Sequence, residues 1–185
     1  MSSLSRTIEY VSLAHSSVPK SVASQFHREV QRVLGDDRGW SGLGYLFSQV
    51  SRQQATRNLR STPEQLIVFV LTPPSILYAD KYREFEAKQL SVADLGTRCI
   101  HFNLDRWQGT CTNLSQLPLK EYREYLINHE TGHMLHFGHF TGADAYPNDG
   151  ANPAPVMMQQ TLGIGDFHPN SWPVDGVDNS PDLRL

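Results

Sequence analysis

The sequence predicts an α+β fold: a twisted mixed sheet backed by helices, with a small loop-rich lobe at the C-terminal end. Three observations lead to this fold class. Short segments of strand-like composition alternate with helical patterns through residues 1–139. The 185 residues are 39 % hydrophobic and 19 % charged, enough for one domain with its own core. Residues 140–185 hold six of the eleven prolines and five of the thirteen glycines, which is typical of loops.

The first elements are expected within residues 7–50. Residues 7–13 have the composition of a strand. A helix is expected over about residues 18–34, because Pro19 suits a first helical turn and Gly35 suits a helix end. Apolar residues recur within this helix at helical spacing: Val22, Phe26, Val30 and Val33. Residues 43–50 again look like a strand.

Two more strands and a second helix are expected before the loop-rich lobe. Residues 66–71 are continuously apolar and stop before two prolines, as expected of a central strand covered on both faces. Residues 100–104 alternate between apolar and polar, the pattern of a half-buried strand. A helix that begins near Pro118 would carry five side chains on one face: Leu119, Tyr122, Leu126, His129 and His133.

Composition excludes several classes of function. The formal net charge of −3 and the pI near 6.2 exclude a strongly basic nucleic-acid-binding protein. Mean hydropathy is −0.42, and no apolar run approaches the roughly 18 residues of a membrane helix. We therefore expect no nucleic-acid or membrane partner. The residues after Met1 lack the apolar stretch of a secretory signal, which favours a cytoplasmic location with Cys99 and Cys111 reduced.

The segment His129–His139 holds four of the eight histidines, and its first five residues read H-E-x-x-H. On a helix, residues four apart share a face, so His129 and His133 can reach one metal ion. Glu130 lies about 100° further round the helix, where its carboxylate approaches a metal-bound water. The order indicates a catalytic Zn²⁺ site, which needs an open position for water and a carboxylate beside it.

Chance is a poor explanation of this motif. With eight histidines and eight glutamates in 185 residues, composition alone yields H-E-x-x-H about 0.015 times per chain. The alternative interpretation is an amphipathic helix whose histidines are only solvated or hydrogen-bonded. A third ligand is expected after the helix, because His129 and His136 would lie about 10 Å apart along its axis. We therefore prefer His139, with Gly138 giving the chain freedom to turn.

The segment resembles the signature of the metzincin zinc peptidases, H-E-x-x-H-x-x-G-x-x-H. It departs from that signature at one position, where His136 replaces the glycine that turns the chain. Either His136 itself adopts a positive φ, or the turn shifts toward Gly138. Metzincins also have a Met-turn below the zinc. Met157 corresponds to the methionine of that turn, with Met158 as the alternative.

More of the chain resembles an uncharacterised, mainly actinobacterial family of metzincin-like domains, whose members are mostly exported. Three stretches match: residues 122–133, 154–163 and 170–173. This resemblance implies a metzincin-like zincin fold, as a single metallopeptidase domain over residues 1–185. Residues 1–139 would form an N-terminal subdomain with the active-site helix, and residues 140–185 a C-terminal subdomain with the Met-turn.

The leading hypothesis is a zinc-dependent endopeptidase acting on a peptide or protein substrate. Zn²⁺ would be held by three ligands, His129, His133 and His139. Glu130 would be the general base for the metal-bound water. The resemblance implies that an extended substrate adds to an edge strand, expected over residues 100–104. The alternative is a zinc-binding recognition or structural module with the same fold and no turnover.

Two further residues are candidates for contacts with a substrate. Tyr146 lies in sequence between His139 and Met157, where its hydroxyl would stabilise an oxyanion or pack a loop. His101 lies on the strand over residues 100–104 and is expected at the rim of the cleft.

Overall fold

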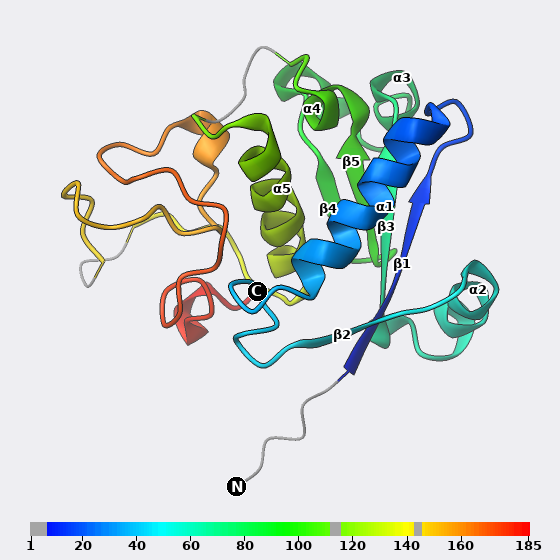
Figure 1. Ribbon diagram of the computed structural model, residues 1–185, viewed down its shortest axis with the longest axis horizontal. Coiled ribbons are helices and arrows are strands. Elements are labelled where there is room, and N and C mark those ends of the chain that lie inside the picture. Colours follow the sequence, from blue (N-terminus) through cyan, green and yellow to red (C-terminus); the bar gives the residue numbers. More distant parts are fainter. Residues whose placement is uncertain (1–6, 112–115, 143–145) are drawn as a thin grey trace, which may run out of the picture.

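A five-stranded sheet forms the centre of the structure (Figure 1). The computed structural model describes residues 7–111, 116–142 and 146–185. In spatial order the strands are β2 (Leu46–Gln49), β1 (Thr7–Ala14), β3 (Leu66–Thr72), β5 (Cys99–Asn103) and β4 (Val92–Asp94). The first four of these run parallel, and β4 is antiparallel to β5 at the edge of the sheet. The sheet is therefore mixed, as predicted.

Helices cover both faces of this sheet. α1 (Lys20–Leu34) and α5 (Leu119–Met134) pack on one face, and α2 (Arg52–Ser61) lies against the other (Figure 1). Short helices and 3₁₀ turns connect the longer elements: η1 (Pro63–Gln65), α3 (Pro74–Leu77), η2 (Arg83–Lys88), α4 (Leu104–Gln108), η3 (Gln160–Leu162) and η4 (Pro181–Leu183). Within the described ranges, no helix combines the length and the apolar character needed to cross a membrane.

Strand β3 needs cover on both faces because its apolar run is unbroken. Three of its residues face the main core with α1 and α5: Ile67, Phe69 and Leu71. Leu66 and Val68 belong to a smaller cluster on the opposite face, together with Ala55 of α2. Successive strand residues alternate between the two faces of a sheet, so each face of β3 needs apolar partners. The predicted central strand over residues 66–71 is confirmed.

Arg98 ties the C-terminal end of α5 to the sheet. This buried residue precedes β5 and has a φ of 57°. Its guanidinium donates to the carbonyl of Leu66 at 3.2 Å and to the carbonyl of Met134, the last residue of α5, at 3.0 Å. The last carbonyls of a helix have no intrahelical partners, and the helix dipole favours a cation beside them. The end of α5 is thereby fixed relative to β3.

Residues 135–142 and 146–185 run mostly as loops, largely on the side of α5 away from the sheet (Figure 1, yellow to red). In the described part of this segment, the regular structure consists of η3, η4 and isolated β-bridges. This irregular course agrees with the proline- and glycine-rich composition of residues 140–185.

The α+β prediction is confirmed, but the predicted edge strand is wrong. The strand over residues 99–103 is β5, which pairs with β3 on one side and β4 on the other. The edge strand on this side of the sheet is β4, and its three residues are too few to show a periodic pattern. Helix α2 was not predicted, because Ala55 is its only buried residue and no apolar periodicity marks it.

Candidate metal centre

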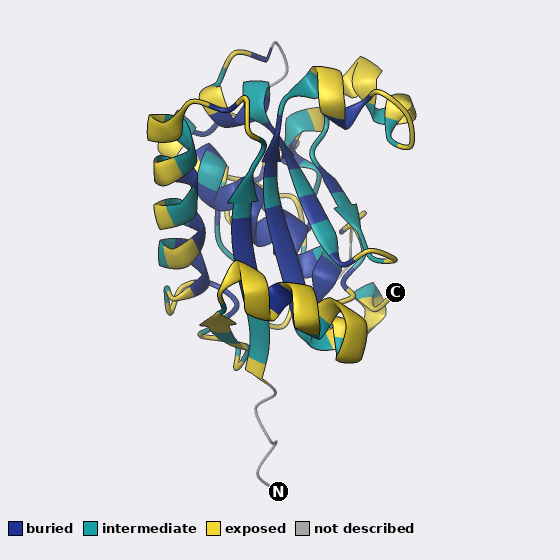
Figure 2. Cartoon of the chain, turned by 90° about the vertical axis from the view of Figure 1, so that its right-hand side faces the viewer, coloured by how far each residue is buried: buried dark blue, intermediate teal, exposed yellow. Residues whose placement is uncertain are grey.

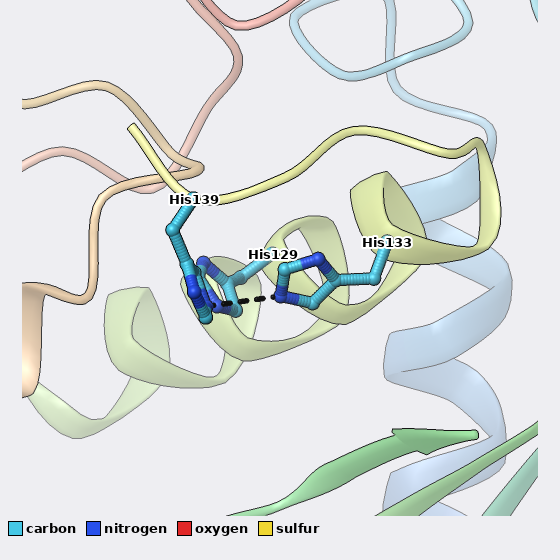
Figure 3. A group of neighbouring side chains, drawn as sticks. All are labelled: His129, His133 and His139. Atoms are coloured by element: carbon cyan, nitrogen blue, oxygen red, sulfur yellow. Dashed lines mark hydrogen bonds between the residues drawn. The ribbon is translucent and has the colours of Figure 1, made fainter. Parts of the chain in front are cut away.

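Three histidines converge beside α5 (Figure 3). His129 and His133 project from neighbouring turns of the helix, and His139 comes from the segment that follows it. Their ligand nitrogens all lie within 4.8 Å of one another. The Nε2 atoms of His133 and His139 are 3.2 Å apart. Two nitrogens bound to one tetrahedral zinc ion lie roughly 3.3 Å apart, so these three side chains can hold a metal ion.

Backbone carbonyls orient two of the three imidazoles. The Nδ1 atom of His129 lies 2.7 Å from the carbonyl oxygen of Val156, and the Nδ1 atom of His133 lies 2.8 Å from that of Phe137. A carbonyl oxygen only accepts hydrogen bonds, so in both rings Nδ1 carries the proton. Nε2 of each ring then carries the lone pair that can bind a metal ion, as in metal-ligating histidines.

Burial keeps the first two histidines neutral. It holds the pKa of His129 well below its usual range, and it lowers the pKa of His133 to about 4, with a further lowering by the neighbouring His139. A protonated imidazole has no lone pair for a metal, whereas a neutral one does. The imidazoles of His129 and His133 are thus uncharged at neutral pH, which is the form that can bind a metal ion.

His136 ends α5 by turning the chain through the left-handed region, with a φ of 68°. The N–H of His136 donates to the carbonyl of His133 at 2.9 Å, and the N–H of Phe137 donates to the carbonyl of Gly132 at 3.0 Å. These two bonds define a Schellman helix end. Of the two alternatives for the turn, the structure has the one centred on His136. Gly138 is not among the residues with positive φ.

Arg184 and Leu183 brace the segment between this turn and the third histidine. An antiparallel bridge pairs Phe137 with Arg184, and the N–H of Gly138 donates to the carbonyl of Leu183 at 2.6 Å. The guanidinium of Arg184 lies 4.3 Å from the centroid of the Phe137 ring and donates to the carbonyl of Leu135. These contacts set the path by which the chain returns toward α5.

Met157 lies directly against the part of α5 that carries His129 and His133. It is fully buried, whereas Met158 is only half-buried. A Cβ atom added to Gly132 would lie 2.2 Å from the sulfur of Met157 and 2.8 Å from the ring of Trp40. The helix can approach these side chains so closely only because residue 132 is glycine. Met157, the residue predicted for a Met-turn, therefore packs against α5 at Gly132.

Asp178 holds the loop that carries Met157. This carboxylate is fully buried and accepts hydrogen bonds from three backbone N–H groups: Val156 at 2.8 Å, Met157 at 2.7 Å and Val174 at 2.7 Å. Burial raises the pKa of Asp178 to about 6, while the three N–H donors oppose that rise. Through Val156, Asp178 is linked to the carbonyl that orients His129. No sequence motif marks this residue.

The histidines and Glu130 line one cleft of about 240 Å³ between α5 and the edge strand. Val92 and Ala93 of β4 form part of its wall. Glu130 follows His129 on the helix and is buried. Burial raises the pKa of Glu130 to about 8, although the positive charge of Arg106 lowers it. The arrangement places a buried carboxyl group beside a potential metal centre, in a cleft that reaches the edge of the sheet.

The structure does not bring the two remaining candidates to this cleft. His101 lies on the face of the sheet opposite α5 and lines a second cavity. Alternation along β5 explains this position, because Phe102 and Ile100 face the main core. The hydroxyl of Tyr146 donates to the carbonyl of Pro153, and its ring packs on Phe167 and Phe140. Tyr146 is a packing residue of the loops and is not part of the cleft wall.

A family model described as "Protein of unknown function (DUF3152)" matches residues 19–180. This chain belongs to the DUF3152 family. Comparison with curated proteins found no match, and neither did comparison with solved structures. The DUF3152 match includes the three histidines, Glu130 and Asp178, whereas Arg184 lies beyond it.

Replacing His136 by glycine should stabilise this DUF3152 protein. The left-handed conformation costs an L-residue about 1–2 kcal/mol, and glycine adopts it freely at some cost in chain entropy. His136 is exposed, so little packing is lost. We expect His136→Gly to raise the free energy of unfolding by about 0.5–1 kcal/mol in urea titrations, with zinc binding unchanged. His136→Ala keeps an L-residue in the left-handed conformation, so its free energy of unfolding should not rise. A loss of zinc in His136→Gly would contradict this account of the turn.

Replacing Asp178 by asparagine should weaken metal binding without removing a ligand. The asparagine amide offers one acceptor oxygen and places an N–H donor against backbone N–H groups. The loop that carries Val156 and Met157 therefore loses part of its support. We expect zinc affinity, measured by competition with a chelator, to fall by about 10- to 100-fold. Asp182→Asn, at an exposed acid in η4, is the matched control. Unchanged zinc affinity in Asp178→Asn would show that this loop does not position His129.

Proposed function

We propose that this DUF3152 protein is a zinc-dependent endopeptidase. The observation that carries the proposal is the convergence of three histidines around one point, with the buried Glu130 in the same cleft. Three neutral nitrogen ligands leave a fourth position of a tetrahedral zinc ion open, as catalytic zinc sites require. A purely structural zinc site usually fills that position with a protein ligand.

The surroundings of the histidines support the metzincin type of zincin fold as the more specific assignment. The sheet has an antiparallel edge strand beside the helix that carries H-E-x-x-H. His136 performs the chain reversal for which the metzincin signature has glycine. Met157 packs against Gly132, where a Met-turn would lie. These features agree with the resemblance of the sequence to metzincins, and the proposal extends that resemblance to the activity.

Glu130 is the proton carrier in the proposed reaction. When bound, Zn²⁺ supplies a Lewis acid that makes a water molecule more acidic and polarises the scissile carbonyl. The Glu130 carboxylate would accept the proton of the attacking water and pass it to the leaving amine. Burial raises the pKa of Glu130, so the carboxyl group binds a proton more readily than an exposed glutamate does. A dication at the histidines would favour the ionised form needed at the start of the reaction.

Strand β4 is the proposed binding edge for the substrate. It is the last strand of the sheet, and two of its residues line the cleft. An extended peptide adds to such an edge through backbone hydrogen bonds, which carry little dependence on substrate sequence. Two buried side chains hold the loop before β4 in place. The Asn103 amide and the Arg106 guanidinium both donate to the carbonyl of Gln89. The edge is thus supported by buried polar contacts.

Replacing Glu130 by glutamine should abolish turnover and leave zinc bound. Glutamine has nearly the same shape but cannot accept and return a proton, and general acid–base catalysis contributes about 10²- to 10⁴-fold to rate. We expect zinc-loaded Glu130→Gln to cleave a fluorogenic peptide library at least about 100-fold more slowly than wild type. Zinc content by atomic absorption should be equal in both proteins.

The matched control is Glu121→Gln, at an exposed position of the same helix, which should cleave at the wild-type rate. Residual wild-type activity in Glu130→Gln would contradict the proposed role of Glu130. A zinc-loaded wild-type protein that cleaves no peptide of the library would favour the alternative function, a zinc-binding module without turnover.

A further inference from the structure

A second cavity lies on the face of the sheet opposite α5. Its volume is about 410 Å³, and within the described ranges of the chain it shares no lining residue with the histidine cleft. Its floor is formed by Leu13, Ala14 and Val70, near the carboxyl ends of β1 and β3. Figure 2 looks toward this side of the molecule, where the helices leave strands of buried and half-buried residues partly uncovered.

The cavity lies between the carboxyl ends of β1 and β3, the two strands from which the chain continues toward opposite edges of the sheet. The chain leaves β1 through α1 to reach β2 on one side, and β3 lies on the other side of β1. Helix α1 packs on one face of the sheet and α2 on the opposite face. In open α/β sheets, ligands bind in the crevice that such a switch point opens at the carboxyl ends of the strands. Here the crevice is lined by residues that end β1 and β3: Ala14, His15 and Thr72.

The walls of the cavity are rich in hydrogen-bond donors. Arg52 at the start of α2, Thr72 and His101 line it, as do His15, Lys81 and Tyr82. Burial lowers the pKa of His101, so this ring offers a neutral N–H. Among the residues that the structure describes, Asp80 is the one acid in the lining. Lys81 and Tyr82 are already bonded to the carboxylate of Asp94, which leaves Arg52 as the principal cation facing a ligand.

We propose that this cavity binds a small organic anion with an apolar body. The apolar floor would take the body of the ligand, and the guanidinium of Arg52 would bind its acid group. Pockets for small ligands are mostly apolar, have a few convergent polar groups and range from about 300 to 1,000 Å³. The volume and the lining meet these conditions. The site is independent of the proposed peptidase activity.

Titration with 2-naphthalenesulfonate tests the proposal. This anion has a planar apolar body, and it is followed by ¹H–¹⁵N correlation spectra of the zinc-loaded protein. We expect saturable shifts for the amides of His15, Thr72 and His101, with the amides of residues 129–139 unmoved. Neutral 2-naphthol should bind at least about fivefold more weakly, because it lacks the charge that pairs with Arg52.

Variants of α2 provide the matched comparison. Arg52→Glu should weaken the binding of 2-naphthalenesulfonate at least about fivefold. Arg57→Glu should leave it unchanged, because this residue is exposed on the same helix and does not line the cavity. Equal affinity for the sulfonate and for naphthol, or equal affinity of Arg52→Glu and wild type, would overturn the proposal. So would shifts confined to residues 129–139, or no saturable shifts. None of these readouts depends on hydrolysis, so the peptidase proposal stands or falls separately.

Discussion

The convergence of the three histidines depends on the chain reversing its direction at His136, at the end of α5. A helix alone can present only two histidines to one ion, because a third residue on the same face lies another turn away along the axis. The left-handed φ of His136 and the two Schellman hydrogen bonds stop the helix within one residue of Leu135. The chain can then return, and His139 comes within 3.2 Å of His133. The rest of the site holds this geometry in place.

Three polar side chains supply that support: Arg98 and Asp178 are buried, whereas Arg184 is exposed. Arg98 and Arg184 satisfy carbonyls at the end of α5, where the helix itself offers no donors. Asp178 accepts hydrogen bonds from two N–H groups of the Met157 loop, those of Val156 and Met157, which would otherwise be buried unpaired. It also accepts one from the N–H of Val174. The Val156 carbonyl of that loop in turn orients His129. The positions of the ligands are thus set by backbone contacts that come from β3, from the Met157 loop and from residues 183–185.

Local patterns predicted the elements whose signal lies in a few neighbouring residues. The apolar run of β3 and the periodicity of α1 and α5 place those elements, and H-E-x-x-H places two histidines on one helical face. The edge strand and His101 were misjudged, because pairing order and the face of a strand depend on residues far away in sequence. Asp178 could not be predicted from the sequence for the same reason. It is one aspartate among several in a loop-rich segment, and only the fold brings it to Val156 and Met157.

The most direct test is the metal content of the purified protein, with wild type measured beside His139→Ala and His136→Ala. We expect about one zinc ion per chain in wild type and in His136→Ala, and a loss of zinc in His139→Ala, because His136 turns the chain whereas His139 is the proposed third ligand. Zinc lost on replacing His136 but not His139 would contradict this assignment of the third ligand. Wild-type protein that binds no zinc would contradict the metal centre itself.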